Sequence, residues 1–239
     1  GEVYVFCNPQ VQYILDHSEE IIQPLRKRGI KVLLGLLGNH DESGLAQLSD
    51  LGAREFAMKL KAICDAYNLD GVNFDDEYSN YPDTDNPLFV NPSSQAGARL
   101  MFVTKKLMPE RYVTTFQYGS MSGVDYVDGV AAGEWLDIAI ANYGGKGYPR
   151  QGMTNANCSG ASVEMARGGS ISVSSAETVK NSDYGYFMVF ALWAAGKQGN
   201  QAQFNSMNNL AQGLYGTPLV KPEYYWPSPL SLETKPLSW

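Results

Sequence analysis

The sequence is poor in histidine and cysteine, and this scarcity argues against several kinds of site. It contains two histidines, His17 and His40, so a histidine-rich metal centre is not expected. Its three cysteines, Cys7, Cys64 and Cys158, are odd in number and widely spaced. Such spacing gives no readable disulfide framework or zinc motif.

Basic residues and long apolar stretches are also scarce. The 18 Lys and Arg residues stand against 25 Asp and Glu residues, which gives a net charge of −7. A nucleic acid partner is not expected, because binding to phosphates normally needs a basic face. No run approaches the ~20 apolar residues of a membrane-spanning helix. No signal peptide can be read in the opening residues, Gly-Glu-Val-Tyr, and any targeting segment is expected to have been removed.

The composition is nevertheless that of a folded protein with a sizeable core. Hydrophobic residues make up 44% of the 239 residues and charged residues 18%. This length suits one α/β barrel or one large sandwich, and it suits two small domains less well. The 15 Tyr, 9 Phe and 4 Trp residues could supply stacking surfaces for sugars, although most of these rings are expected to be buried.

Short apolar runs alternate with longer segments of helical periodicity. Seven runs are predicted as strands: Val3–Phe6, Lys31–Gly38, Asp70–Asp75, Tyr112–Tyr118, Leu136–Tyr143, Ala161–Met165 and Tyr184–Trp193. Helices are predicted near residues 10–28, 50–67, 96–107, 174–182 and 201–214, with an irregular tail over residues 217–239. Strand–helix repetition with strands apolar on both faces indicates a parallel sheet.

Two architectures fit this alternation of strands and helices: an open doubly wound sheet and a (β/α)8 barrel of the TIM type. The first strand is not followed by G-x-G-x-x-G, the fingerprint of dinucleotide-binding sheets. Most predicted strands instead end in polar or aromatic residues: Asn39-His40, Asp75-Asp76-Glu77, Gln117-Tyr118, Asn142-Tyr143 and Trp193. Barrel enzymes build their active sites from such strand ends, so this pattern favours the barrel.

The segment Tyr67–Tyr81 contains the most informative motif. On a strand, side chains alternate between faces, so Asn73, Asp75 and Glu77 are expected to point the same way. Two neighbouring carboxylates cannot both ionise easily, and the one with the raised pKa becomes a usable proton donor. The alternative interpretation is an acidic loop that caps the next helix or holds a cation such as calcium.

The stretch Leu69–Tyr78 reads L-D-G-V-N-F-D-D-E-Y. It resembles the D-x-x-D-x-D-x-E signature of glycoside hydrolase family 18. It is closer to the L-D-G-V-x-F-D-D-E-Y of that family's endo-β-N-acetylglucosaminidase branch, the endoglycosidase H and F1 type. The stretch Val11–His40 resembles the same branch, and Phe116–Tyr118 and Ala141–Gly144 fall where the family places later active-site strands.

This resemblance implies a fold as well as an activity. The whole chain, residues 1–239, would be a single catalytic barrel of the (β/α)8 type. The first strand–helix unit would lie before Val3, so residues 1–239 would lack it and the natural chain would be longer. The missing insertion domain and the short connections favour the endo-β-N-acetylglucosaminidase branch over the chitinases of the family.

The resemblance also implies a mechanism that retains configuration without an enzymic nucleophile. Glu77 would protonate the glycosidic oxygen, and the 2-acetamido group of the substrate would attack the anomeric carbon. Asp75 would orient that acetamide and offset the positive charge. The family has Asp where this chain has Asn73, which can hydrogen-bond Asp75 but cannot take a proton. No metal and no cofactor is implied.

Further site residues follow from the resemblance and from strand ends. Tyr143 fits the tyrosine that the family places against the acetamide oxygen, the alternative being a core aromatic. Six residues are predicted to bind substrate: Gln117, Tyr118, Asn142, Trp193, Asn39 and His40. For Gln117 a loop-supporting role is an equal alternative, and for His40 a structural role.

Three functions remain open at this point. The first is an endo-β-N-acetylglucosaminidase that cleaves the chitobiose core of N-linked glycans, with an N-acetylglucosamine-containing glycan or glycoprotein as partner. The second is a chitinase, and the third is a catalytically silent glycan-binding barrel. The substrate class predicts a secreted, periplasmic or cell-surface location.

Overall fold

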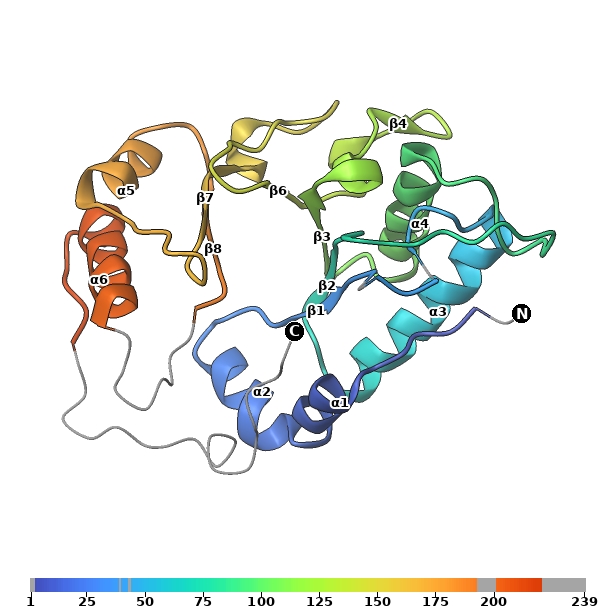
Figure 1. Cartoon of the computed structure of the whole chain (residues 1–239), viewed down its shortest axis with the longest axis horizontal. Coiled ribbons are helices and arrows are strands. Elements are labelled where there is room, and N and C mark those ends of the chain that lie inside the picture. The colour runs from blue at the N-terminus through green and yellow to red at the C-terminus, as the bar shows by residue number, and fades with distance from the viewer. Residues whose placement is uncertain (1–2, 39, 43, 193–200, 221–239) are drawn as a thin grey trace.

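The computed structural model describes residues 3–38, 40–42, 44–192 and 201–220, and the ribbon in Figure 1 follows their strand–helix order. The helices are α1 (Pro9–Asp16), α2 (Ser18–Lys27), α3 (Asp50–Ala66), α4 (Ser94–Leu107), α5 (Val173–Lys180) and α6 (Gln201–Tyr215). The strands are β1 (Leu33–Leu36), β2 (Gly71–Phe74), β3 (Tyr112–Gln117), β4 (Tyr126–Val127), β5 (Val130–Ala131), β6 (Ile138–Ala141), β7 (Ser159–Glu164) and β8 (Tyr186–Phe190).

The main strands are parallel and follow one another side by side. One sheet has the order β1-β2-β3-β6, and a second pairs β7 with β8. An isolated parallel bridge between Ala139 and Cys158, and a 2.8 Å hydrogen bond from the Ala141 N–H to Ser159 Oγ, join β6 to β7. The result is an arc of parallel strands (Figure 1). Within the described part of the chain, no strand pairs with the outer edge of β1 or of β8.

A glycine makes the close pairing of β2 possible. Gly71 has φ of +155°, and a Cβ at this position would lie 2.1 Å from the carbonyl oxygen of Tyr112 in β3. Only a residue without a side chain fits there. Val72 and Phe74, on the same strand, are fully buried. The D-G-V-N-F sequence therefore sets both the start of β2 and its contact with the core.

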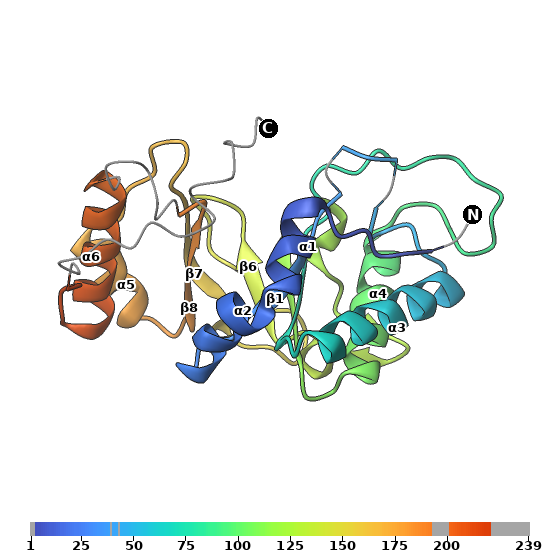
Figure 2. The ribbon, with the colours of Figure 1, turned by 90° about the horizontal axis from the view of Figure 1, so that it is seen from below.

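The helices cover the outer side of the arc. Figure 2 shows α3 and α4 beside the strands from β1 to β3, and α5 and α6 beyond β7 and β8. The larger core includes the fully buried side chains of Phe74, Leu60, Leu100, Met101 and Trp135. A smaller cluster under α5 and α6 contains Met165, Ile171, Ala176 and Leu210. Burial of apolar surface on this side leaves the inner side of the arc for polar and aromatic residues.

Two predictions about local structure were wrong, and one short hairpin was not predicted. Residues 3–8 form no strand, although Val3–Phe6 is apolar. The helix predicted over residues 10–28 is two helices that meet at His17, because α2 turns to contact the end of α3: the Gln23 side-chain amide donates to the Tyr67 carbonyl at 3.0 Å. The hairpin β4–β5 lies in a loop that carried no strand pattern.

The loops that follow β1 and β2 are joined to each other. Main-chain hydrogen bonds run from Ser49 N–H to the Leu88 carbonyl at 2.9 Å and from Val90 N–H to the Gln47 carbonyl at 2.7 Å. The Gln47 side chain also donates to the Pro82 carbonyl at 2.6 Å. Two loops distant in sequence therefore form one wall at the carboxyl ends of the strands.

No helix in the described residues is long and apolar enough to cross a membrane. Thr217–Val220 have no regular structure, and the rest of the predicted tail lies outside the described residues.

Candidate active site

The acidic motif continues directly from β2. Asp75 N–H donates to the Leu36 carbonyl at 3.0 Å, which extends the ladder between β1 and β2 by one residue. Asp75 Oδ1 accepts a hydrogen bond of 3.2 Å from the Glu77 N–H. Asp76 turns away from this pair, and its Oδ1 accepts from Leu45 N–H at 2.9 Å. Asp75 and Glu77 are therefore joined to each other, while Asp76 holds the loop that contains Leu45.

Burial and nearby negative charges change the acidity of these two carboxyl groups. Asp75 is half-buried, and burial followed by the charge of Glu77 raises its pKa from 3.8 to about 7. Burial also raises the pKa of Glu77, and the nearby Glu164 carboxylate adds to that increase. Both groups can therefore hold a proton at higher pH than free carboxylic acids do. The expected raised pKa thus occurs in both members of the pair.

Asn73 contacts β3 rather than Asp75. Its Oδ1 accepts a 2.7 Å hydrogen bond from Thr114 Oγ1. No hydrogen bond between Asn73 and Asp75 is found in the described residues, so the expected direct partnership is not present. The Asp75 carboxylate consequently depends on the Glu77 main chain for its hydrogen bond.

Tyr143 lies just past β6, between aromatic rings of two other strands. Its ring centroid is 5.7 Å from that of Phe116 and 5.7 Å from that of Phe190. Burial raises the pKa of the Tyr143 phenol well above its usual range, and the charges of Glu164, Glu77 and Asp75 act in the same direction. Its hydroxyl is therefore a hydrogen-bond donor at all ordinary pH values. Tyr143 is therefore close enough to Asp75 and Glu77 for their charges to act on its phenol.

Aromatic side chains continue around the site on the side of the joined loops. The rings of His40 and Tyr78 stack at 5.0 Å, and Tyr78 meets Tyr118 edge to face at 6.1 Å. Tyr78 is 49% exposed and follows Glu77 in sequence, so part of its side chain is open to solvent beside that carboxyl group. Aromatic rings with open faces are common stacking surfaces for sugar rings.

The remaining predicted substrate-binding residues differ in their burial and in their hydrogen bonds. Gln117 is buried, and its side-chain amide is bonded at both ends to the main chain of Tyr148, at 2.9 and 3.0 Å. These contacts favour the loop-supporting role for Gln117. Asn142 is exposed, and its Oδ1 accepts from Tyr143 N–H at 2.7 Å. Asn39 and Trp193 lie outside the described residues.

Two charged residues near the site were missed by the sequence analysis. Glu164 is the last residue of β7, and Arg167 follows in the next turn, with Arg167 Nε 3.4 Å from Glu164 Oε1. The charges of both act on Glu77 and on Tyr143. A polar residue at the end of a predicted strand was the signal available for Glu164, and it was the same signal that found Gln117.

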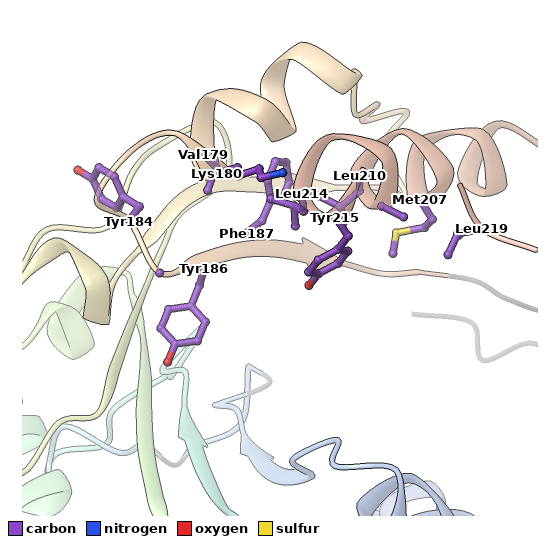
Figure 3. A pocket seen from close by; sticks show the side chains of 12 residues that line it. Val179, Lys180, Tyr184, Tyr186, Phe187, Met207, Leu210, Leu214, Tyr215 and Leu219 are labelled. Carbon is purple, nitrogen blue, oxygen red and sulfur yellow. The ribbon is translucent and has the colours of Figure 1, made fainter. Parts of the chain in front are cut away.

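A cavity elsewhere on the molecule has a different character. It has a volume of about 470 Å³ and lies between α5, α6 and β8, lined mainly by apolar side chains such as Phe187, Met207 and Leu210 (Figure 3). None of the predicted catalytic residues lines it. In the same view Tyr186 points from β8 away from these helices. The inner face of β8 and its outer, helix-covered face are therefore separate surfaces.

The geometry around Glu77 suits the hydrolysis of a glycosidic bond, which needs a proton donor, a second carboxylate and a surface for sugar rings. Among the described residues, no group of three or more His, Cys, Asp or Glu side chains is arranged to hold a metal ion. Fold and site together define the class as the glycoside hydrolases that work from the carboxyl ends of parallel strands.

Comparison with known proteins narrows this class. The chain is 40% identical over 225 residues to endo-β-N-acetylglucosaminidase F1 of Elizabethkingia meningoseptica, an alignment that covers 92% of this chain and 66% of that protein. The crystal structure of EndoBT-3987 of Bacteroides thetaiotamicron in complex with Man9GlcNAc2Asn substrate has a TM-score of 0.86 and 49% identity, and covers 93% of this chain and 56% of the other. The chain therefore belongs to the endo-β-N-acetylglucosaminidases of glycoside hydrolase family 18.

Two further comparisons show how far this family assignment reaches. The catalytic domain of a family GH18 chitinase from the fern Peteris ryukyuensis has a TM-score of 0.50 at 12% identity, covers 80% of this chain and 77% of the other, and shows the fold alone. No protein-family model matches the sequence. The chain spans about two thirds of the first curated relative and about half of the solved EndoBT-3987 chains.

Proposed function

We propose that this chain is the catalytic part of an endo-β-N-acetylglucosaminidase that cleaves the β-1,4 bond between the two N-acetylglucosamine units of the N-glycan chitobiose core. The observation that carries the proposal is the Asp75–Glu77 pair, in which both carboxyl groups have raised pKa values. The relatives supply the substrate class. One EndoBT-3987 structure contains Man9GlcNAc2Asn substrate and another contains Man5GlcNAc product.

In the proposed reaction, Glu77 donates its proton to the glycosidic oxygen as the bond from that oxygen to the anomeric carbon breaks. The carbonyl oxygen of the substrate's own 2-acetamido group forms the new bond to the anomeric carbon, giving an oxazolinium ion. Ionised Asp75 accepts from the acetamide N–H and offsets the positive charge. The Tyr143 hydroxyl, which stays protonated, donates toward the acetamide oxygen.

The second step returns the enzyme to its starting state. Glu77, now a carboxylate, takes a proton from water, and the water oxygen attacks the anomeric carbon from the face that the leaving group occupied. The oxazolinium ring opens, and the product keeps its original configuration. Since the nucleophile belongs to the substrate, the sugar on the non-reducing side of the cut must carry an N-acetyl group.

Glycan release from a high-mannose glycoprotein, followed by mass spectrometry, tests this function. We expect the protein to leave a single N-acetylglucosamine on asparagine and Glu77→Gln to release nothing detectable. Glu110→Gln is the matched control, because Glu110 is exposed at the opposite end of β3. A folded protein that releases no glycan but degrades chitin oligomers would be the chitinase. One that binds either ligand without turnover would be the silent barrel, for which the replacement of Asp by Asn73 is the supporting observation.

We also propose that the arc of six parallel strands is part of a closed (β/α)8-type barrel, whose remaining strands include a first strand–helix unit outside residues 1–239. The support comes from the outer edge of β8, which is unpaired in the described residues. Tyr186 and Phe190 on this strand are 40% and 51% exposed. Unpaired strand edges tend to pair with another strand. The test is to fuse the amino-terminal strand–helix segments of endo-β-N-acetylglucosaminidase F1 to this chain. Closure predicts a higher melting temperature and higher activity, and an unchanged melting temperature would contradict it.

The proposed substrate sets the expected location. N-linked glycans are displayed on the outside of cells, so we propose a secreted, periplasmic or cell-surface protein. Fractionation of the source cells with a specific antibody would test this, and recovery in the cytoplasm alone would contradict it.

A further inference from the structure

Glu164 is placed on the inner side of the strand arc by the alternation of β7. Its neighbour Val163 packs into the small apolar cluster under α5 and α6, so the next side chain points the opposite way. Opposite Glu164 in the β7–β8 register stands Phe190, whose ring contacts Tyr143. The side chain of Glu164 is 13% exposed. A nearly buried carboxylate therefore faces the same space as Tyr143 and Glu77.

We propose that Glu164 is a positioning residue whose negative charge keeps the proton on Glu77 and on the Tyr143 hydroxyl, and that Arg167 moderates this effect. The inference rests on the proposed function, because Glu77 is the proton donor only in that reaction. It adds a second acidic residue, supplied by a different strand, to the carboxylate pair of the motif.

The contacts of Glu164 differ from those of carboxylates that serve the fold. Such structural carboxylates each accept from a main-chain N–H and from a side chain: Asp70 from Val32 and Arg26, Asp76 from Leu45 and Ser79, and Asp137 from Val113 and Lys105. In the described residues, Glu164 has a single ion-pair contact of 3.4 Å with Arg167, whose side chain is 82% exposed. An exposed partner neutralises a buried charge poorly, so most of the field of Glu164 reaches the site.

In the described part of the chain, the charged and titratable groups around Glu77 include Asp75, Tyr78, Tyr143, Glu164 and Arg167, with His40 and Tyr118 against the Tyr78 ring. Burial is the largest cause of the raised pKa of Glu77, Glu164 adds to it, and Arg167 opposes it. For Tyr143 the same two residues act with the same signs, and Glu164 has a stronger effect than either Asp75 or Glu77. Geometry and charge therefore agree that Glu164 acts on both proton-bearing groups.

The test uses two substitutions that are expected to shift the pH dependence of kcat/KM in opposite directions. Glu164→Gln removes the negative charge and should move the alkaline limb of kcat/KM, which reports protonated Glu77, to lower pH by roughly half a unit. Arg167→Gln should move that limb to higher pH by a smaller amount, because Arg167 is exposed and its charge is screened; for the same reason this variant should fold normally. Glu177→Gln, on the exposed side of α5, is the control and should leave the limb in place.

A second readout separates this inference from the proposed function. Carbon-13 NMR titration of the glutamate carboxyl groups, with the Glu77 signal assigned through Glu77→Gln, follows the same proton without turnover. A lower Glu77 pKa in Glu164→Gln together with a higher one in Arg167→Gln supports the inference even if no glycan is released. Unchanged values, or shifts of the same sign in both variants, overturn it.

Discussion

Replacing Asp75 by Asn should stabilise the fold while it removes a catalytic group. The folded protein raises the pKa of Asp75 from 3.8 to about 7, so it binds that proton more tightly than the unfolded chain does. Asp75 therefore costs the fold nothing below pH 3.8. The free energy of unfolding falls as the pH rises from 3.8 to about 7, and the full cost is present above pH 7. Asn has no charge to bury, and its amide oxygen can still accept from the Glu77 N–H.

The pKa difference sets the size of this effect. A difference of this size is worth at most about 4 kcal/mol, and solvent screening of a half-buried carboxyl group reduces it to about 2 kcal/mol. We expect Asp75→Asn to exceed the wild type by about 2 kcal/mol in free energy of unfolding at pH 8, and by less than about 1 kcal/mol at pH 4.5.

Urea denaturation followed by tryptophan fluorescence at these two pH values measures the difference. Two control variants provide a comparison for the change in the free energy of unfolding. Asp70→Asn should be destabilising at pH 8, because hydrogen bonds from Arg26 and Val32 outweigh burial and lower the pKa of Asp70. Asp83→Asn, at an exposed position, should change little. The reasoning is refuted if Asp75→Asn is no more stable than the wild type at pH 8, or if its gain is the same at both pH values.

Three further outcomes follow from the site and the fold. Tyr143→Phe keeps the ring between Phe116 and Phe190 but removes the hydroxyl, so kcat should fall by roughly 10²-fold with the melting temperature unchanged; a large change in KM alone would point to ground-state binding instead. Gly71→Ala places a Cβ 2.1 Å from the Tyr112 carbonyl oxygen, and the urea midpoint should drop by an amount equivalent to about 2 kcal/mol or more; an unchanged midpoint would contradict the strand pairing described. The kcat/KM profile should rise through an apparent pKa of about 7, because Asp75 must be ionised to offset positive charge, and a rise complete by pH 5 would argue against this role.

Features that depend on one contiguous segment were predictable from the sequence. The strand over Gly71–Phe74, with its acidic continuation, was read from a period of two and a run of carboxylates. Helix α3 was predicted to within a residue or so, because a regular apolar stripe marks it. Alternation along the same segment accounts for Asp76, which turns away from Asp75 and Glu77 and accepts from Leu45 N–H.

Features that depend on distant contacts were not predictable. Val3–Phe6 is apolar, yet apolar residues form a strand only when a neighbouring strand pairs with them. The break at His17 arises from contacts of α2 with the end of α3, which no local pattern encodes. Glu164 comes from a strand far along the chain, and its effect on Glu77 exists only because the sheet curves. Tertiary geometry, rather than residue type, decides these three cases.

The joined loops after β1 and β2 bear on how this scaffold could be redesigned. Asp76 bonds to Leu45 in one loop, and main-chain bonds link Gln47 and Ser49 to Val90 and Leu88 in the other. A transplant of either loop alone would sever these bonds and disturb the segment that carries Glu77. Residues 44–49 and residues 76–92 therefore form one structural unit at this wall. Loop grafts between relatives should exchange both segments at once.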